Sequence, residues 1–220
     1  MTSSVSAIDG VTFDLDGTLY DHGVVRWPLL LRNVFRLRVL RVGHRVREEL
    51  RQRSFDTGAL LLAEEAHVVG ERLGVPPVRA RALLDAAFER SLSAVLKRHR
   101  HAGSHAALAA LAARLPIAVV SDRRIDDKLA ALGLLHLPWA AKVSADDTGA
   151  LKPSPRPFLL ACQRMGIAPA RALHIGDRDD TDGEGARAAG LCFRLVGGPS
   201  DLPAVVAEVL ALDADPLASP

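Results

Sequence analysis

The sequence predicts an α/β fold, a doubly wound parallel sheet with an α-helical insertion, and three observations lead to it. Short apolar stretches alternate with helical patterns beyond about residue 102. Between residues 21 and 101 the patterns are helical only. Carboxylates and a hydroxyl directly follow several apolar stretches, where strands would end. Because buried strands alternating with helices are typical of a parallel sheet covered on both faces, we expect a sheet domain of residues 1–20 and 102–220 and a helical domain of residues 21–101.

Five short apolar stretches are expected to be the strands. They are 10–13 (GVTF), 116–120 (PIAVV), 139–143 (WAAKV), 171–175 (RALHI) and 191–196 (LCFRLV). Helical periodicity lies between the later ones, at 104–115, 125–135, 155–165 and 182–189. In such sheets ligands bind beyond the carboxyl ends of the strands, so residues that follow the strands are expected to converge.

The insertion is predicted to consist of helices. The first carries an apolar stripe at three-to-four-residue spacing, formed by Trp27, Leu30, Leu31, Val34, Leu37 and Leu40. A second helix is expected over 60–73, and the prolines that precede residue 78 mark the start of a third at 78–96.

The composition argues against several other classes of protein. Nearly half of the 220 residues are apolar, and a net charge of +2 argues against a dedicated nucleic-acid-binding protein. The two cysteines, Cys162 and Cys192, lack the spacing of a zinc site and fit a reducing compartment. The first ten residues do not resemble a signal peptide, and no apolar run approaches the roughly 20 residues that span a bilayer. We therefore expect a cytoplasmic protein without a membrane partner, whose oligomeric state the sequence does not indicate.

The stretch FDLDGTLYD (Phe13–Asp21) places two acids at the end of the first expected strand. Side chains two residues apart on a strand point the same way, so Asp14 and Asp16 can address one ligand together. One carboxylate can attack an electrophile while the other transfers protons, or both can help to hold a hard cation such as Mg²⁺. A polar turn at a strand end is the simpler alternative.

A second acidic segment, HIGDRDDTDGEGA (His174–Ala186), follows the fourth expected strand. It is not an EF-hand loop, because with Gly183 at the sixth position an arginine and an alanine would occupy the first and twelfth positions, where acids are needed. A solvated acidic loop is the other alternative. Since Asp177 directly follows the buried strand, we expect it to be a metal ligand and Asp182 to support it.

Lys152 and Ser121 complete the set of candidate residues. Lys152 lies in the proline-stiffened loop GALKPSP, and acids around a phosphoryl group need a fixed positive charge nearby. On its own, a lysine before a proline is usually a surface residue. Ser121 follows the stretch 116–120, where it can cap the next helix, donate to a ligand, or do both.

In this order the four segments resemble the haloacid dehalogenase superfamily of hydrolases. The family pattern is DxDGT, a Ser or Thr after an apolar strand, a Lys often followed by Pro, and GD followed by another acid. The matching residues here are Asp14–Thr18, Ser121, Lys152, Asp177 and Asp182. The resemblance covers about residues 7–20 and 102–198 and implies a Rossmann-like core, whereas the insertion matches in position and helical character and implies a cap domain.

The resemblance implies a phosphatase chemistry. Asp14 would attack phosphorus and form an aspartyl-phosphate, and Asp16 would protonate the leaving group and then deprotonate the attacking water. Ser121 and Lys152 would hold the phosphoryl oxygens. An acid at position 16 favours phosphate-ester hydrolysis, because family members that cleave carbon–halogen bonds usually lack it.

The resemblance also implies Mg²⁺ as the cofactor. The ion would be held by Asp14, by the backbone carbonyl of Asp16 and by Asp177. Thr18 and Asp182 are expected to support the site.

Two positions depart from the family pattern. Asp122 stands where Asn is common, and its charge near a phosphate is unfavourable unless Arg123 or Arg124 compensates it. Arg178 stands where a small polar residue is commoner, and the sequence does not indicate whether it reaches the substrate.

The first half of the insertion is rich in arginine. Between Asp21 and Asp56 only four acids accompany nine arginines, which are Arg26, Arg32, Arg36, Arg38, Arg41, Arg45, Arg47, Arg51 and Arg53. A solvated helix face is the ordinary interpretation, and recognition of an anionic leaving group is the sharper one. The sharper hypothesis predicts that charge reversal at Arg32 and Arg36 raises KM.

The function expected from the sequence is hydrolysis of a phosphate monoester, with a small phosphorylated molecule as the partner. A phosphosugar mutase is the enzymatic alternative. A non-catalytic module that binds phosphorylated ligands or a protein is the alternative from another class, and the intact acids argue against it. The sequence does not identify the physiological substrate.

Overall fold

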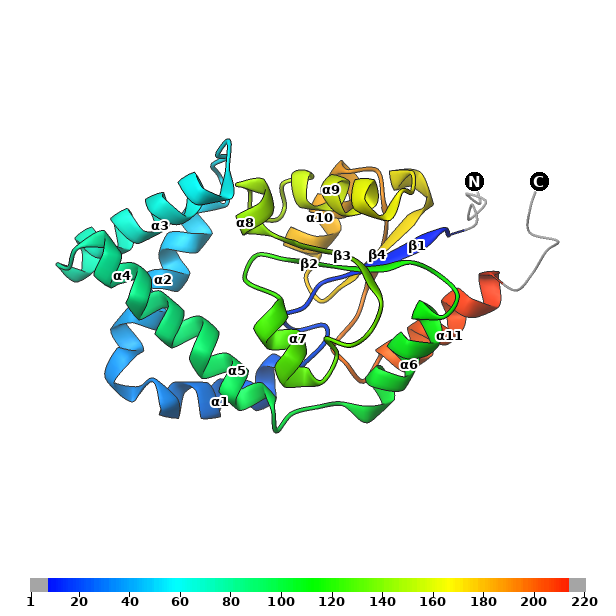
Figure 1. Ribbon diagram of the computed structural model, residues 1–220, viewed down its shortest axis with the longest axis horizontal. Helices are drawn as coiled ribbons and strands as arrows, with labels where there is room; N and C mark the ends of the chain where they lie inside the picture. The colour runs from blue at the N-terminus through cyan, green and yellow to red at the C-terminus, as the bar shows by residue number, and fades with distance from the viewer. Residues whose placement is uncertain (1–7, 214–220) are drawn as a thin grey trace.

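A computed structural model describes residues 8–213 and contains a five-stranded parallel sheet (Figure 1). In chain order the strands are β1 (Gly10–Phe13), β2 (Ile117–Ser121), β3 (Trp139–Ser144), β4 (Ala172–Gly176) and β5 (Cys192–Leu195). Their order across the sheet is β3-β2-β1-β4-β5, and every pairing between them is parallel. The predicted fold class is therefore confirmed.

The two ends of the chain lie outside this description. The expectation about a signal peptide concerns residues before residue 8, and the expected sheet domain extends beyond residue 213. Within residues 8–213 no helix combines the length and the apolar character that crossing a bilayer requires.

Helices cover both faces of the sheet (Figure 1). One face carries α6 (Ala102–Ala112), α7 (Asp126–Leu132) and α11 (Leu202–Asp213), and the other carries α9 (Arg156–Met165) and α10 (Glu184–Ala188). In β2, Ile117 and Val119 belong to the first core and Ala118 and Val120 to the second. Because alternate residues of a strand point to opposite faces, a strand covered on both faces is a continuous apolar run.

β1 lies in the middle of the sheet, so its carboxyl end is the centre of the edge where ligands bind. Phe13 is in register with Val119 of β2 and with Ile175 of β4. Asp14 and Asp177 therefore emerge from neighbouring strands at the same edge.

The insertion forms a lobe that faces this edge (Figure 1). Its helices are α1 (His22–Arg32), α2 (Leu37–Leu50), α3 (Gly58–Leu73), α4 (Pro77–Leu84) and α5 (Ser91–Leu96), with a π-helical segment (Asp85–Arg90) between the last two. α2, α3 and α4 share a core with Ala145 of the short helix α8 (Ala145–Thr148). Val25 of α1 and Leu92 of α5 instead belong to the core of the sheet. The lobe is thus held to the sheet by packing as well as by its two chain connections.

The apolar stripe expected in the first helix is not one buried face. α1 ends at Arg32, and a 3₁₀ turn (Val34–Arg36) precedes α2. Asn33 is buried at the break, where its Nδ2 donates to the carbonyl of Leu29 at 3.0 Å. Trp27 is left 71% exposed, because α1 packs Val25 and not Trp27 into the core.

Candidate active site

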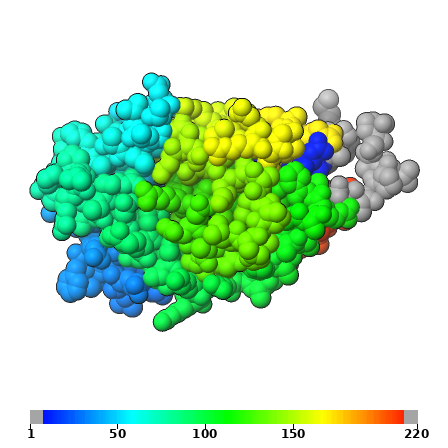
Figure 2. Space-filling model, viewed as in Figure 1, coloured from blue at the N-terminus to red at the C-terminus, as the bar shows by residue number. Residues whose placement is uncertain are grey.

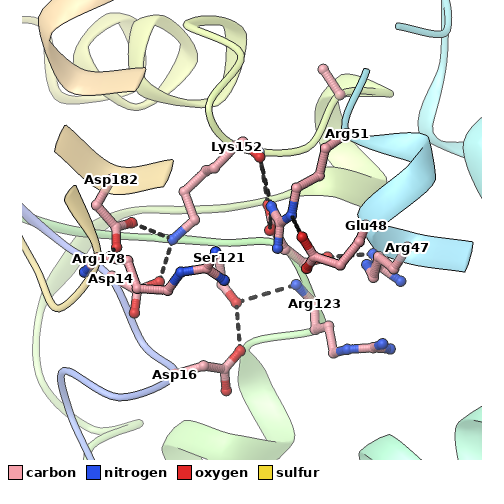
Figure 3. Close-up of polar contacts among 12 residues, drawn as sticks. Asp14, Asp16, Arg47, Glu48, Arg51, Ser121, Arg123, Lys152, Arg178 and Asp182 are labelled. Atoms are coloured by element: carbon pink, nitrogen blue, oxygen red, sulfur yellow. Dashed lines mark hydrogen bonds and ion pairs between the residues drawn. The ribbon is translucent and has the colours of Figure 1, made fainter. Parts of the chain in front are cut away.

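Asp14, Lys152 and Asp182 form a buried cluster at the carboxyl edge (Figure 3). Asp14 directly follows β1, Lys152 lies in the loop between α8 and α9, and Asp182 lies in the turn after β4. The Lys152 Nζ contacts Asp14 Oδ1 and donates to Asp182 Oδ1 at 2.6 Å. The structure therefore brings together three of the residues that the sequence singled out.

Asp177 adds a third carboxylate to the two acids of this cluster. Oxygens of Asp14, Asp177 and Asp182 all lie within 4.8 Å of one another. The Oδ2 of Asp14 is buried and has no hydrogen-bond partner within residues 8–213. Gly17 has a φ of 102°, and a Cβ added there would lie 2.1 Å from Asp177 Oδ2, so the chain passes this carboxylate closely.

The electrostatics of these acids suit a bound cation. Burial raises the pKa of Asp14, and the charges of Asp182 and Asp16 add to this effect, while Lys152 acts in the opposite direction. Burial also raises the pKa of Asp177, with a contribution from Asp182. A hard divalent cation prefers all-oxygen sites of this kind and would favour the ionised form of both acids.

Asp16 is held by a separate set of side chains. Lys128 Nζ lies 2.6 and 2.7 Å from its two carboxylate oxygens, and Tyr20 OH donates to it at 2.6 Å. Ser121 Oγ lies 3.4 Å from Asp16 Oδ2. Although burial opposes ionisation, the Lys128 ammonium and these hydrogen bonds hold the pKa of Asp16 well below its usual range.

Lys128 is a site residue that sequence reasoning missed. It lies on α7, fully buried, and pairs with Asp16 across 112 positions of the chain. The sequence did contain a signal for this role, because Lys128 lies three residues after Ile125 and four before Leu132, and both of these are buried. A lysine on the apolar face of a helix needs a buried partner, because an unpaired buried charge is costly.

His174 is a second site residue that was missed. It lies in β4, fully buried, with Nε2 at 3.4 Å from Asp182 Oδ1 and Nδ1 at 2.8 Å from Thr12 Oγ1. Burial lowers its pKa, so the neutral ring fits a Thr12 hydroxyl that donates to Nδ1 while Nε2–H points to Asp182. A histidine inside an apolar strand is the signal that the sequence offered.

The charge of Asp122 is compensated, but by neither of the expected arginines. Arg51, directly after α2, donates to Asp122 Oδ2 at 2.5 Å and to the carbonyl of Lys152 at 2.6 Å. Asp122 Oδ1 in turn accepts from the Lys152 backbone N–H at 2.9 Å. Arg123 instead stacks 3.9 Å over the ring of Phe88, and Arg124 turns to Asp146. The expectation was wrong because the compensating cation comes from the insertion, 71 positions away.

The other candidates lie at the same edge. Ser121 Oγ accepts from the Arg123 N–H at 3.2 Å and also faces Asp16, but it does not cap the next helix, because α7 follows Ile125. Thr18 Oγ1 is buried without a hydrogen-bond partner among the described residues. Arg178 pairs with Asp180 at 2.7 Å and lines the cavity described next.

A cavity of about 450 Å³ lies between the sheet edge and the insertion. Asp14, Asp16, Lys128, Lys152, Asp177 and Asp182 line its polar side. Its apolar side is formed by Val25, Leu29, Leu30, Phe88 and Leu92, which come from the insertion. The cavity thus joins a charged floor to an apolar wall, an arrangement typical of small-molecule sites.

Comparison with known proteins agrees with the family resemblance that the sequence indicates. A family model described as haloacid dehalogenase-like hydrolase matches residues 8–190. The phosphoglycolate phosphatase of Shigella dysenteriae is 30% identical over 203 residues, which cover 83% of this chain and 79% of that protein. The haloacid dehalogenase-like hydrolase domain-containing protein 3 of Mus musculus is 39% identical over 97 residues, 43% of this chain and only 38% of that relative's length. The solved structure of 2-haloacid dehalogenase from Pseudomonas syringae matches with a TM-score of 0.61 and 26% identity, covering 93% of this chain and 98% of that one.

Proposed function

The chain belongs to the haloacid dehalogenase-like hydrolase family and is a hydrolase, and on this premise we propose that it hydrolyses small-molecule phosphate monoesters. The observation that carries the proposal is the pairing of two clusters in one cavity. One contains Asp14 with Lys152, and the other contains Asp16 with Lys128. A nucleophile and a proton-transferring group are thereby held side by side.

The proposed reaction has two steps. First, an oxygen of Asp14 bonds to phosphorus while the bond from phosphorus to the leaving oxygen breaks, which gives an aspartyl-phosphate. Water then bonds to phosphorus, the bond to Asp14 breaks, and phosphate leaves. Lys152 and Ser121 are proposed to hold the phosphoryl oxygens, and the contact between Lys152 and Asp14 supports this role.

Asp16 is proposed to give a proton to the leaving oxygen and then to take one from the attacking water. The Lys128 ion pair favours the ionised carboxylate, which suits the second role. The same pair opposes the first role, because a proton on Asp16 weakens its attraction to Lys128. We infer that this contact loosens when a leaving group enters the cavity.

Mg²⁺ is the proposed cofactor. Asp14, the backbone carbonyl of Asp16 and Asp177 would hold it, with Thr18 and Asp182 as supporting residues. The all-oxygen donor set and the partnerless Oδ2 of Asp14 support this assignment. When bound, the ion supplies positive charge that offsets the charge of the phosphoryl oxygens.

The insertion, residues 21–101, is proposed to be a cap over the site. Arg51 and Arg47 both bridge from α2 to Asp122 in the sheet domain, and the cavity has walls from both parts. Such a cap excludes water from the reaction. Arg32 and Arg36 do not line the cavity, whereas Arg26 does. The cavity therefore supports recognition of an anionic leaving group by Arg26 and not by Arg32 or Arg36.

An assay of a generic aryl phosphate, with and without Mg²⁺, tests the proposed function. Metal-dependent release of phosphate is expected from the wild type and is expected to be lost in Asp14→Asn, which keeps the shape of the side chain. The matched control is Asp180→Asn, because Asp180 is an exposed acid of the neighbouring loop and, among the described residues, its side chain pairs only with Arg178. Its activity is expected to stay near that of the wild type.

Two outcomes would contradict the proposal. Halide release from a 2-haloacid, without phosphate release, would assign the chain to the chemistry named for its neighbour from Pseudomonas syringae. Binding without turnover across a broad panel of phosphate monoesters would identify a ligand-binding module instead.

A further inference from the structure

The surface of α1 and the following 3₁₀ turn exposes large apolar side chains. Trp27, Leu31 and Phe35 are 71%, 73% and 99% exposed, and Val24 and Val34 are also exposed beside them. Trp27 and Leu31 lie four residues apart on α1, on the same side of the helix. Figure 2 shows this segment as a blue lobe that projects from the molecule. We call Val24, Trp27, Leu31, Val34 and Phe35 the α1 patch.

The segment around the α1 patch is strongly basic. Residues 22–47 contain seven arginines and no acid. Arg26, Arg32, Arg36, Arg41 and Arg45 are exposed there. In the part of the chain that the structure describes, Arg32 and Arg36 have no carboxylate within ion-pair distance, in contrast to Arg53 and Arg72 further along. Exposed apolar side chains and cations without an acidic partner thus occur together in one short segment of the chain.

We propose that the α1 patch docks the protein on an anionic lipid surface. A helix with Trp, Phe and Leu on one side and arginines around them is typical of peripheral membrane contact, in which the apolar side chains enter the headgroup boundary. Each arginine near an anionic surface strengthens such binding about fivefold. Such docking requires no membrane-spanning stretch, and the proposal replaces the expectation from sequence that the protein has no membrane partner.

Charge complementarity favours a lipid surface over a second copy of the chain. A symmetric dimer through the α1 patch would bring two sets of Arg32 and Arg36 together, because the same surface meets itself in such an interface. An anionic bilayer offers the opposite charge and an apolar layer at once.

Docking through the α1 patch leaves the catalytic cavity free. α1 places Val25, Leu29 and Leu30 against the cavity, whereas the residues of the patch do not line it. The proposal therefore stands independently of the reaction that the site catalyses.

Vesicle co-sedimentation tests the proposal. Wild-type protein is expected to sediment with phosphatidylcholine vesicles that contain phosphatidylglycerol, and not with phosphatidylcholine alone. Reversal of two charges in Arg32→Glu/Arg36→Glu is expected to weaken binding about 25-fold or more, from about fivefold for each arginine. Leu31→Ser/Phe35→Ser is expected to weaken it at least tenfold, from ~0.8 kcal/mol for each buried CH₂ group.

A matched control separates the α1 patch from exposed residues in general. Val78 and Arg79 are an exposed apolar residue and an exposed arginine of α4, outside the patch. Val78→Ser/Arg79→Glu is expected to bind vesicles within about threefold of the wild type, because one distant arginine contributes little beyond a Debye length of about 10 Å. Circular dichroism and thermal melting check that every variant is folded.

The fluorescence of Trp27 also reports directly whether the α1 patch enters the bilayer. Trp139, which donates to the carbonyl of Leu134, is the other tryptophan, so Trp139→Phe makes Trp27 the only one. Its emission is expected to shift to the blue with anionic vesicles and to be quenched by brominated lipids. If Trp139→Phe does not fold, quenching is measured in the wild type, where Trp27 is the exposed tryptophan.

Three results would overturn the proposal. They are no sedimentation with anionic vesicles, sedimentation that Leu31→Ser/Phe35→Ser does not weaken, and a Trp27 emission that is unchanged by vesicles. Self-association without lipid that Leu31→Ser/Phe35→Ser abolishes would assign the α1 patch to a second copy instead.

Discussion

Replacement of Lys128 by methionine tests the charge pair beneath the site. Lys128 is fully buried, and the side chain of Asp16 is 24% exposed. Removal of one partner of a buried ion pair costs about 3–5 kcal/mol, because the other charge is left uncompensated. Since Asp16 is partly exposed, we expect the lower end, about 3 kcal/mol near pH 7. For a chain of this size that corresponds to a fall in Tm of about 6–12 °C.

The pH dependence of this loss follows from the pKa of Asp16. In the folded wild type the pKa of Asp16 is depressed. The pair therefore stabilises the fold fully above the ordinary aspartate pKa of about 3.9. This stabilisation is lost only as the pH falls through the lower pKa that Asp16 has in the folded state. Without Lys128, we expect burial to outweigh the Tyr20 hydrogen bond and to raise the pKa of Asp16 above its ordinary value. The variant is then destabilised mainly above about pH 4, where the Asp16 carboxyl ionises readily in the unfolded chain but not in the folded protein. The difference from the wild type is expected to be smaller near pH 5 than near pH 7.

Urea unfolding at both pH values measures the effect. Lys142→Met is the matched control, since Lys142 pairs with Asp126 at the surface, and it is expected to cost at most ~1 kcal/mol at either pH. Adding Asp16→Asn to Lys128→Met is expected to recover most of the loss. A cost below about 1 kcal/mol near pH 7, or no recovery in the double variant, would refute the reasoning.

Two further substitutions test the proposed metal site and the contact between the insertion and the sheet. Gly17→Ala is expected to abolish the rise in Tm on adding Mg²⁺, because the new Cβ would lie 2.1 Å from Asp177 Oδ2. The control Gly74→Ala, which has a positive φ but open space around it, is expected to keep this rise. Equal Mg²⁺ binding by Gly17→Ala and the wild type in calorimetry would contradict the prediction. Arg51→Met is expected to lower kcat/KM for an aryl phosphate about tenfold, because the uncompensated charge of Asp122 would raise the barrier by ~1.4 kcal/mol. Adding Asp122→Asn is expected to restore kcat/KM. Arg53→Met, at an exposed ion pair, is the control, and a similar loss there would assign the effect to net charge.

The sequence alone determined the sheet and the residues at its edge. Each strand was predicted to within one residue. β1 and β2 are buried throughout, and a strand buried on both faces is a short apolar run whatever its neighbours are, whereas the edge strand β5 is largely exposed. Asp14 and Asp177 could be placed at the same edge because parallel strands end together.

Only the tertiary structure decided which charges meet. The pairing of Lys128 with Asp16 and of Arg51 with Asp122 spans 112 and 71 positions, and it depends on how the helices pack, which no local pattern encodes. The break at Asn33 was likewise invisible in the apolar spacing, and the buried Asn33 Nδ2 also lies 3.4 Å from the carbonyl of Ala87, 54 positions away. Periodicity reports which face of an element is buried, whereas the partner of a buried polar group is fixed by the packing of the whole chain.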